Sequence, residues 1–185
     1  MWWSPSPRCV IYPDEFIVRR SLRKSLRNCG FDFSIDQAFD HVIHSCAQPR
    51  DGDDGTWITS EMMRAYSGLN RLGHAHSVEI WQGEDLVGGL YGIAIGSVFF
   101  GESMFSRRRD ASKIALACLT RFLQHHGFRL IDAQVTSSHL LSLGAREIDR
   151  EQFIEELERY CQLENTVDIW QTARVQVKQF YFDYE

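Results

Sequence analysis

The chain has 185 residues and a formal net charge of −5, with 44% hydrophobic and 24% charged residues. This ordinary globular composition excludes a wholly disordered chain, a collagen and a coiled coil. No apolar run approaches the roughly 18 residues needed to cross a bilayer, and the first residues lack the features of a secretory signal. Five scattered cysteines indicate reduced thiols and neither a disulfide framework nor a zinc site. We therefore expect a cytoplasmic protein.

The negative charge is concentrated near the C-terminus. Residues 1–140 hold 15 basic and 15 acidic residues, whereas residues 141–185 hold 5 basic and 10 acidic residues. A basic run without an acidic residue consists of Arg19, Arg20, Arg23, Lys24 and Arg27, and a second cluster is Arg107, Arg108 and Arg109. Nucleic-acid binding depends on such local patches and not on the total charge. The patches are compatible with an RNA partner, and the alternative is a solvated helix face.

Hydrophobic spacing and capping residues predict mainly helices in the first 73 residues. In chain order these are a helix over 14–28 capped by Asp14, a strand over 31–35, a helix capped by Asp36, a polar loop over 48–54, and a helix over 60–72 capped by Thr59 or Ser60.

From Ala75 onward the pattern changes to strands. The predicted elements are strands over 75–82, 86–95 and 97–104, a helix over 110–126, a strand over 129–135, a short helix near 137–143, a charged helix over 150–162 and a final β-rich segment. This order predicts an α+β fold with a mixed sheet flanked by helices. We expect residues 1–73 to form the N-terminal part of the catalytic unit, 74–150 its core, and 151–185 an acidic extension.

Six short segments stand out along the chain. They are Trp2-Trp3-Ser4-Pro5, Gly55-Thr56-Trp57-Ile58, His74-Ala75-His76-Ser77-Val78-Glu79, Leu86-Val87-Gly88-Gly89-Leu90-Tyr91-Gly92, Gly101-Glu102-Ser103-Met104-Phe105-Ser106 and Leu130-Ile131-Asp132-Ala133-Gln134-Val135. In this order and spacing they resemble the bacterial leucyl/phenylalanyl-tRNA–protein transferases, from Trp2 to about Phe153.

The resemblance implies an enzyme that moves leucine or phenylalanine from its tRNA to the N-terminal amine of proteins beginning with Arg or Lys, which marks them for degradation. It also implies a GNAT-like fold, with aminoacyl-tRNA in place of acetyl-CoA and no cofactor. The segment 105–110 agrees, because it lacks the glycines that cradle a pyrophosphate before a helix. The basic run from Arg19 to Arg27 is then the candidate tRNA-binding surface. We expect no metal site, because the histidine pairs have no Cys or carboxylate at matching spacing.

Asp132 and Gln134 alternate along a predicted strand, which places both side chains on one face. The resemblance implies that this pair acts on the incoming amine. An α-amine has a pKa of about 8, so the protein needs mainly to position it and to receive its proton. We expect Asp132 to attract the cationic acceptor and polarise Gln134. The alternative is a polar residue at a strand end, although an unpaired carboxylate beside Ile131 and Val135 would be costly.

The resemblance also implies a pocket for the transferred amino acid. Glu102 would line it, with a structural salt bridge as the alternative, and Trp57 would stack on the terminal adenosine, with simple packing as the alternative. The apolar wall would consist of Leu90, Phe99, Leu116, Leu119 and Ile131, which form a pocket only if a void lies between them.

The chain also departs from the family pattern. Typical members carry an N-terminal domain ahead of the Trp-Trp-Ser-Pro motif, so we expect a short form without it. Three interpretations stay open: an active transferase, an aminoacyl-tRNA-dependent enzyme acting on another amine such as a small molecule, or a non-catalytic relative that binds tRNA or a degradation signal. We expect a monomer that does not bind membranes.

Overall fold

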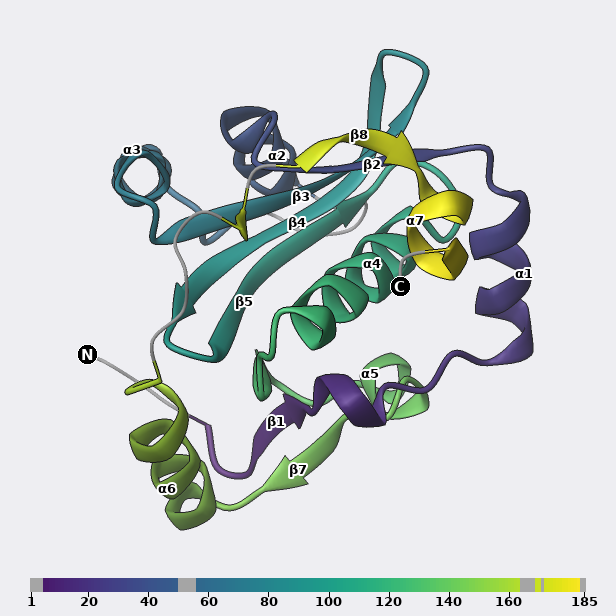
Figure 1. Ribbon diagram of the computed structural model, residues 1–185. Helices are drawn as coiled ribbons and strands as arrows, with labels where there is room; N and C mark the ends of the chain where they lie inside the picture. The colour runs from purple at the N-terminus through teal and green to yellow at the C-terminus, as the bar shows by residue number, and fades with distance from the viewer. Residues whose placement is uncertain (1–4, 50–55, 164–168, 171, 184–185) are drawn as a thin grey trace.

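The computed structural model describes residues 5–49, 56–163, 169–170 and 172–183 (Figure 1). Its strands form one sheet in the order β7-β1-β6-β5-β4-β3-β2-β8. They are β1 (Arg8–Ile11), β2 (Asp32–Ile35), β3 (Ala75–Gln82), β4 (Asp85–Ile95), β5 (Val98–Ser106), β6 (Leu130–Gln134), β7 (Arg146–Ile148) and β8 (Thr172–Gln176). Neighbouring strands are antiparallel except β5 and β6, which are parallel, so the predicted α+β fold with a mixed sheet is confirmed.

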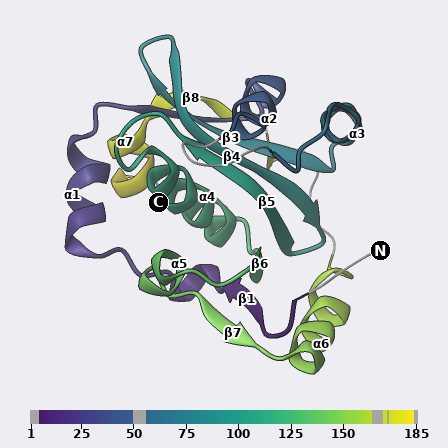
Figure 2. The same cartoon turned by 180° about the vertical axis from the view of Figure 1, so that it is seen from behind.

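Helices cover both faces of this sheet. They are the short 3₁₀ helix η1 (Pro13–Glu15) and the α-helices α1 (Arg20–Asn28), α2 (Phe39–Cys46), α3 (Ser60–Arg71), α4 (Ala111–His125), α5 (Ser138–Ser142), α6 (Arg150–Tyr160) and α7 (Val177–Asp183). Figure 2 shows α2 and α3 on one face of the central strands, and α4 with α1 and α7 on the other. None of the helices in the described ranges is long and apolar enough to span a membrane.

The two faces have separate hydrophobic cores. The larger core includes Phe33, Leu90, Phe99, Leu119 and Phe122, and it lies on the α4 side. The second core is built around Tyr91 and packs beneath α2 and α3. Because α4 is buried on most of its surface, it fixes the β5–α4–β6 crossover that places the site.

The central meander follows the sequence prediction closely. β3, β4 and β5 pair along almost their whole length, and tight turns at Gly83 and Gly96, both with positive φ, connect them. In β4, a Cβ atom at Gly88 would lie 2.5 Å from the Cβ of Ala111. This glycine therefore lets the start of α4 approach the sheet.

The parallel pairing of β5 with β6 is short. It covers only Val98 with Leu130, Phe99 with Ile131, and Phe100 with Asp132, after which the ladder ends. β5 continues to Ser106, whereas β6 ends at Gln134. A wedge between the two strands follows from this difference, and the candidate site lies in it.

The predicted helix over 14–28 is wrong in its first half. Residues 13–15 form η1, the chain is then extended, and α1 starts at Arg20 with no side-chain cap from Asp14. The backbone N–H of Ile17 donates to the carbonyl of Leu143 at 2.8 Å, so a tertiary contact satisfies this group in place of the Asp14 side chain.

Asp36 is not the cap of the second helix. It adopts a left-handed conformation with φ of 55° and accepts a hydrogen bond from the Ser77 backbone at 2.7 Å. The first backbone N–H groups before α2 are satisfied by the buried Glu79 of β3, which accepts from Gln37 at 3.3 Å and Ala38 at 3.4 Å. The predicted α3 is confirmed, with Thr59 as its cap.

The strands β1 and β7 and the helix α7 were not predicted from the sequence. β1 inserts between β6 and β7, so the first predicted range, 1–73, contributes to the same sheet as the core. At the C-terminus, β8 confirms the β-rich prediction, but it is followed by α7. Strands from all three predicted ranges thus share one sheet. Most of the predicted loop over 48–54, and Trp2, Trp3, Ser4 and Gly55 of the motifs, lie outside the described residues.

Candidate active site

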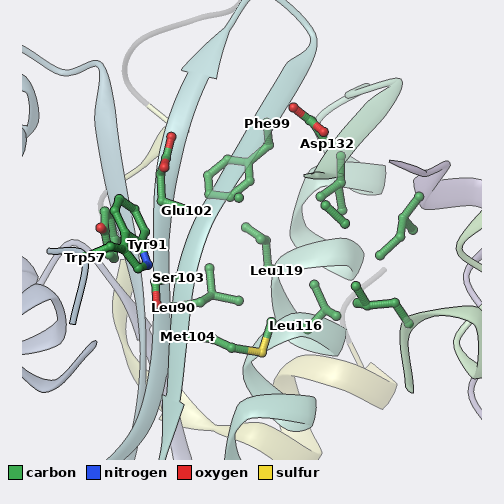
Figure 3. A pocket seen from close by; sticks show the side chains of 15 residues that line it. Trp57, Leu90, Tyr91, Phe99, Glu102, Ser103, Met104, Leu116, Leu119 and Asp132 are labelled. Carbon is green, nitrogen blue, oxygen red and sulfur yellow. The ribbon is translucent and has the colours of Figure 1, made fainter. Parts of the chain in front are cut away.

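A cavity of about 320 Å³ opens where β5 and β6 separate (Figure 3). All five apolar residues expected for the pocket line it: Leu90, Phe99, Leu116, Leu119 and Ile131. Four further apolar side chains, which the sequence analysis did not predict, complete the wall: Ile11, Met104, Ala133 and Leu140. The void that these side chains needed in order to form a pocket is therefore present.

Polar groups lie at one end of this cavity. Glu102 of β5 and Asp132 of β6 direct their carboxyl groups toward the same end, while Leu116 and Met104 lie at the other (Figure 3). Trp57 also lines the cavity and is 54% exposed. A large aromatic ring that is half exposed at a cavity is better suited to stack on a ligand than to pack in a core.

Asp132 is fully buried and has a charged partner. The Arg8 guanidinium of β1 donates to both of its oxygens, from Nε to Oδ1 at 2.8 Å and from Nη2 to Oδ2 at 2.6 Å. The other side of this guanidinium lies over the ring of Phe153 of α6, at 5.3 Å from the centroid. Such a two-point ion pair balances the buried charge and fixes its geometry.

Gln134 has an unusual backbone. Its φ is 64°, and its N–H donates to Oδ1 of Asp132 at 2.9 Å. The register of β6 against β1 shifts at this point, so the regular alternation that predicted Asp132 and Gln134 on one face does not hold. The Gln134 side chain instead donates from Nε2 to the carbonyl of Gly101 at 2.7 Å, across the gap between β6 and β5. Gln134 does not itself line the cavity, but its amide contacts residues that do.

Glu102 has a different environment. It is partly buried, and hydrogen bonding from the side chains of Tyr66 of α3 and Gln134 favours its ionised form and lowers its pKa. Burial raises the pKa of Glu102 above its ordinary value, and the two hydrogen bonds only partly oppose this shift. No cation among the described residues forms an ion pair with Glu102, so the salt bridge considered as an alternative is not seen in that part of the chain.

Three residues of the site were not identified from the sequence. Arg8 and Tyr66 hold the two carboxylates, and Tyr91 lines the cavity with a fully buried hydroxyl that has no partner among the described residues. A buried carboxylate requires a counter-ion, which was the one available signal for Arg8. Nothing in the spacing indicated which of the 20 basic residues would supply it.

The candidate tRNA-binding residues lie mainly on α1. Arg20, Arg23, Lys24 and Arg27 are exposed, whereas Leu22 and Leu26 of the same helix are buried. Arg19 precedes the helix and donates to the carbonyl of Ser142 at 2.9 Å.

One hydrogen bond joins α1 to the segment that follows the second basic cluster. Ser25 of α1 donates to Asp110 at 2.9 Å, next to Arg109 and just before α4. This contact joins α1 to the residue after Arg109, whereas Arg107 donates to Leu86 and Ser45 and Arg108 donates to Gln82.

Comparison with known proteins identifies one family. Residues 10–158 match the family described as leucyl/phenylalanyl-tRNA protein transferase. A protein of that name from Chromohalobacter salexigens is 56% identical over 173 residues, which are 94% of this chain and 68% of that protein. Its namesake from Chromobacterium violaceum is 54% identical over 157 residues, 85% of this chain and 67% of that protein.

A third relative of the same name, from Shewanella loihica, is 47% identical over 178 residues, 96% of this chain and 75% of that protein. The chain thus spans about two thirds to three quarters of the length of these relatives. An alignment of 178 residues extends past Phe153, so the likeness does not end there as the motifs suggested.

Proposed function

This chain belongs to the leucyl/phenylalanyl-tRNA protein transferase family, and we propose that it moves leucine or phenylalanine from tRNA to the N-terminal amine of a protein. The acceptors we propose are proteins that begin with Arg or Lys. The amine attacks the aminoacyl ester directly, without a covalent enzyme intermediate. We place the activity in the cytoplasm and assign it to a monomer.

The cavity between β5 and β6 is the observation that carries this proposal. Its apolar end offers a water-poor site for a Leu or Phe side chain, and its other end holds two carboxyl groups next to Gln134. An apolar pocket with a few convergent polar groups is the usual form of a small-ligand site, and its volume lies at the lower end of the usual range of about 300–1,000 Å³.

The remaining site residues have roles that follow from their contacts. Trp57 stacks on the terminal adenosine of the tRNA, beside the mouth of the cavity. Asp132, held by Arg8, keeps the Gln134 backbone in its left-handed conformation and so positions the Gln134 amide for the incoming amine. The exposed cations of α1 contact the tRNA phosphates.

Peptide extension tests the proposal. The protein is mixed with phenylalanyl- or leucyl-tRNA and a peptide that begins with Arg, and mass spectrometry follows the addition of one residue. A peptide with an acetylated N-terminus is the matched control, because its amine cannot attack. We expect extension of the free peptide alone. Binding of the charged tRNA without extension of any amine would contradict the proposed activity and indicate a binding protein.

The acceptor is tested separately with peptides that differ only in their first residue. We expect extension of peptides beginning with Arg or Lys and little extension of those beginning with Met. Extension of small-molecule amines in preference to either would retain the transfer chemistry and overturn the proposed acceptor.

A further inference from the structure

Aminolysis of an ester leaves one proton to be placed. The amine nitrogen forms a bond with the ester carbonyl carbon, the bond from that carbon to the ribose oxygen breaks, and the 3′ hydroxyl of the tRNA leaves. The attacking nitrogen starts with one proton more than an amide nitrogen can keep, and this proton must go to a base. Where this proton goes matters only if the chain catalyses the transfer, so the inference rests on the proposed function.

Asp132 is unsuited to this task. Both of its oxygens accept from Arg8, and Oδ1 also accepts from the Gln134 backbone. Its side chain is fully buried and its charge is balanced by a guanidinium. To accept a proton it would have to give up part of a two-point ion pair, which leaves the guanidinium without its partner.

Gln134 is unsuited for a chemical reason. A carboxamide has no basic nitrogen and its oxygen is a hydrogen-bond acceptor with negligible affinity for a proton at neutral pH. Its nitrogen is engaged with the carbonyl of Gly101. The amide can orient the amine, but it cannot keep the proton.

We propose that Glu102 is the general base that takes up the proton of the attacking amine. Glu102 lines the cavity and lies at the same end as Asp132 (Figure 3). The Gln134 side chain donates from Nε2 to the carbonyl of Gly101 at 2.7 Å, so the group that orients the amine is bound to the residue next to Glu102. No guanidinium or ammonium group in the described part of the chain forms an ion pair with it.

The groups around Glu102 are consistent with a base. Tyr66 and Gln134 donate hydrogen bonds to its ionised form, Arg8 favours that form by its charge, and Asp132 opposes it. Burial outweighs these effects and raises the pKa of Glu102, which brings its proton affinity closer to that of an amine at neutral pH. A base of this kind is more effective than an ordinary surface carboxylate.

The proton then has a complete route. The ionised Glu102 accepts it from the nitrogen as the C–N bond forms, and the neutral carboxyl can pass it to the ribose oxygen as the C–O bond breaks. Glu102 is ionised again at the end, and no other reactant is consumed.

The test compares Glu102→Gln with Asp132→Asn in single-turnover transfer from phenylalanyl-tRNA to an Arg-initiated peptide. Loss of a general base typically slows a reaction by about 10²–10⁴-fold, and we expect Glu102→Gln to show this loss with unchanged tRNA binding and thermal unfolding. In wild type the rate falls as pH drops through the raised pKa of Glu102. Glu102→Gln loses this dependence and retains only that of the amine, whereas Asp132→Asn retains both.

Chemical rescue separates a base from a structural role. Added formate should restore part of the rate of Glu102→Ala, because the small carboxylate can occupy the vacated position, and it should not restore Asp132→Ala. If Glu102→Gln transfers within tenfold of the wild-type rate, or formate rescues only Asp132→Ala, the assignment is overturned. Absence of transfer by the wild-type protein would instead overturn the proposed function itself.

Discussion

The strands β5 and β6, which separate at the cavity, each carry one carboxylate, and the two carboxylates have different surroundings. On β6, Asp132 is fully buried and bound by the Arg8 guanidinium through both oxygens. On β5, Glu102 is partly exposed, and no cation of the described residues forms an ion pair with it. Two side chains that differ by one methylene thus acquire different chemistry from their surroundings, one as a fixed structural charge and the other as a group that can exchange a proton.

The largest effect is expected on the β6 side. Arg8→Met leaves a buried carboxylate without its counter-ion, which typically costs about 3–5 kcal/mol of unfolding free energy. Urea unfolding measures this loss. Glu102→Gln, the matched change on β5, should alter stability much less.

A double variant sharpens this prediction. Arg8→Met combined with Asp132→Asn removes both charges, so it should be more stable than Arg8→Met alone. If the double variant unfolds as easily as the single one, the Arg8 contribution comes from its contact with Phe153 and not from the ion pair.

Substitutions on the basic surface of α1 should weaken tRNA binding and leave the environments of Asp132 and Glu102 unchanged. Replacing the four exposed cations of α1 with Gln removes phosphate contacts; these are Arg20, Arg23, Lys24 and Arg27. We expect tRNA binding to weaken roughly 10- to 100-fold at physiological salt. The slope of log K against log salt concentration should become less steep by about one per lost contact. Filter binding at several salt concentrations measures this. A salt dependence equal to that of wild type would remove α1 from the tRNA interface.

Trp57 should affect binding through stacking. Trp57→Ala removes an interaction of ~1–3 kcal/mol, which weakens aminoacyl-tRNA binding by roughly 5- to 150-fold. The half-exposed ring adds little to the fold, so the unfolding free energy should stay close to that of wild type. Trp57→Phe is the control that keeps an aromatic surface. A stability loss in both variants, with unchanged tRNA affinity, would indicate a packing residue.

The smallest effect is expected for Tyr66 of α3, which affects the pKa of Glu102 on β5. Its hydroxyl donates to Glu102 and lowers the pKa of that carboxyl, so Tyr66→Phe should raise it further. Because the base must be ionised, the acid limb of the transfer rate moves to higher pH. At pH values well above this limb the rate should match wild type. A limb that moves to lower pH would contradict the hydrogen bond assigned to Tyr66.

The sequence predicted the regular parts of the fold well. β3, β4, β5 and α4 appear close to their predicted bounds, because alternation and helical spacing are local signals. The break between η1 and α1 was not predictable in the same way, since the extended segment is held by a carbonyl at Leu143. That contact is a tertiary interaction and leaves no trace in local spacing.

The site was predictable in its residues but not in its connections. The motifs indicated Asp132, Gln134 and Glu102, and the structure brings all three to one end of a cavity or its immediate edge. Arg8 is 124 positions from Asp132, so only the fold reveals the pair. The cavity itself depends on a strand pairing that stops after three residues, which hydrophobic spacing cannot report.

The buried Glu79 has a consequence for how the chain folds. It supplies hydrogen-bond acceptors to the start of α2, at Gln37 and Ala38, from a strand some 40 positions later in the chain. No side chain caps this helix locally, so its first turn gains these partners only after β3 has aligned with β2. The loop closed by that alignment includes α3, and its closure entropy must be overcome before α2 is complete. We therefore expect α2 to be among the last elements to become protected from hydrogen exchange during refolding, after the β3–β4 hairpin.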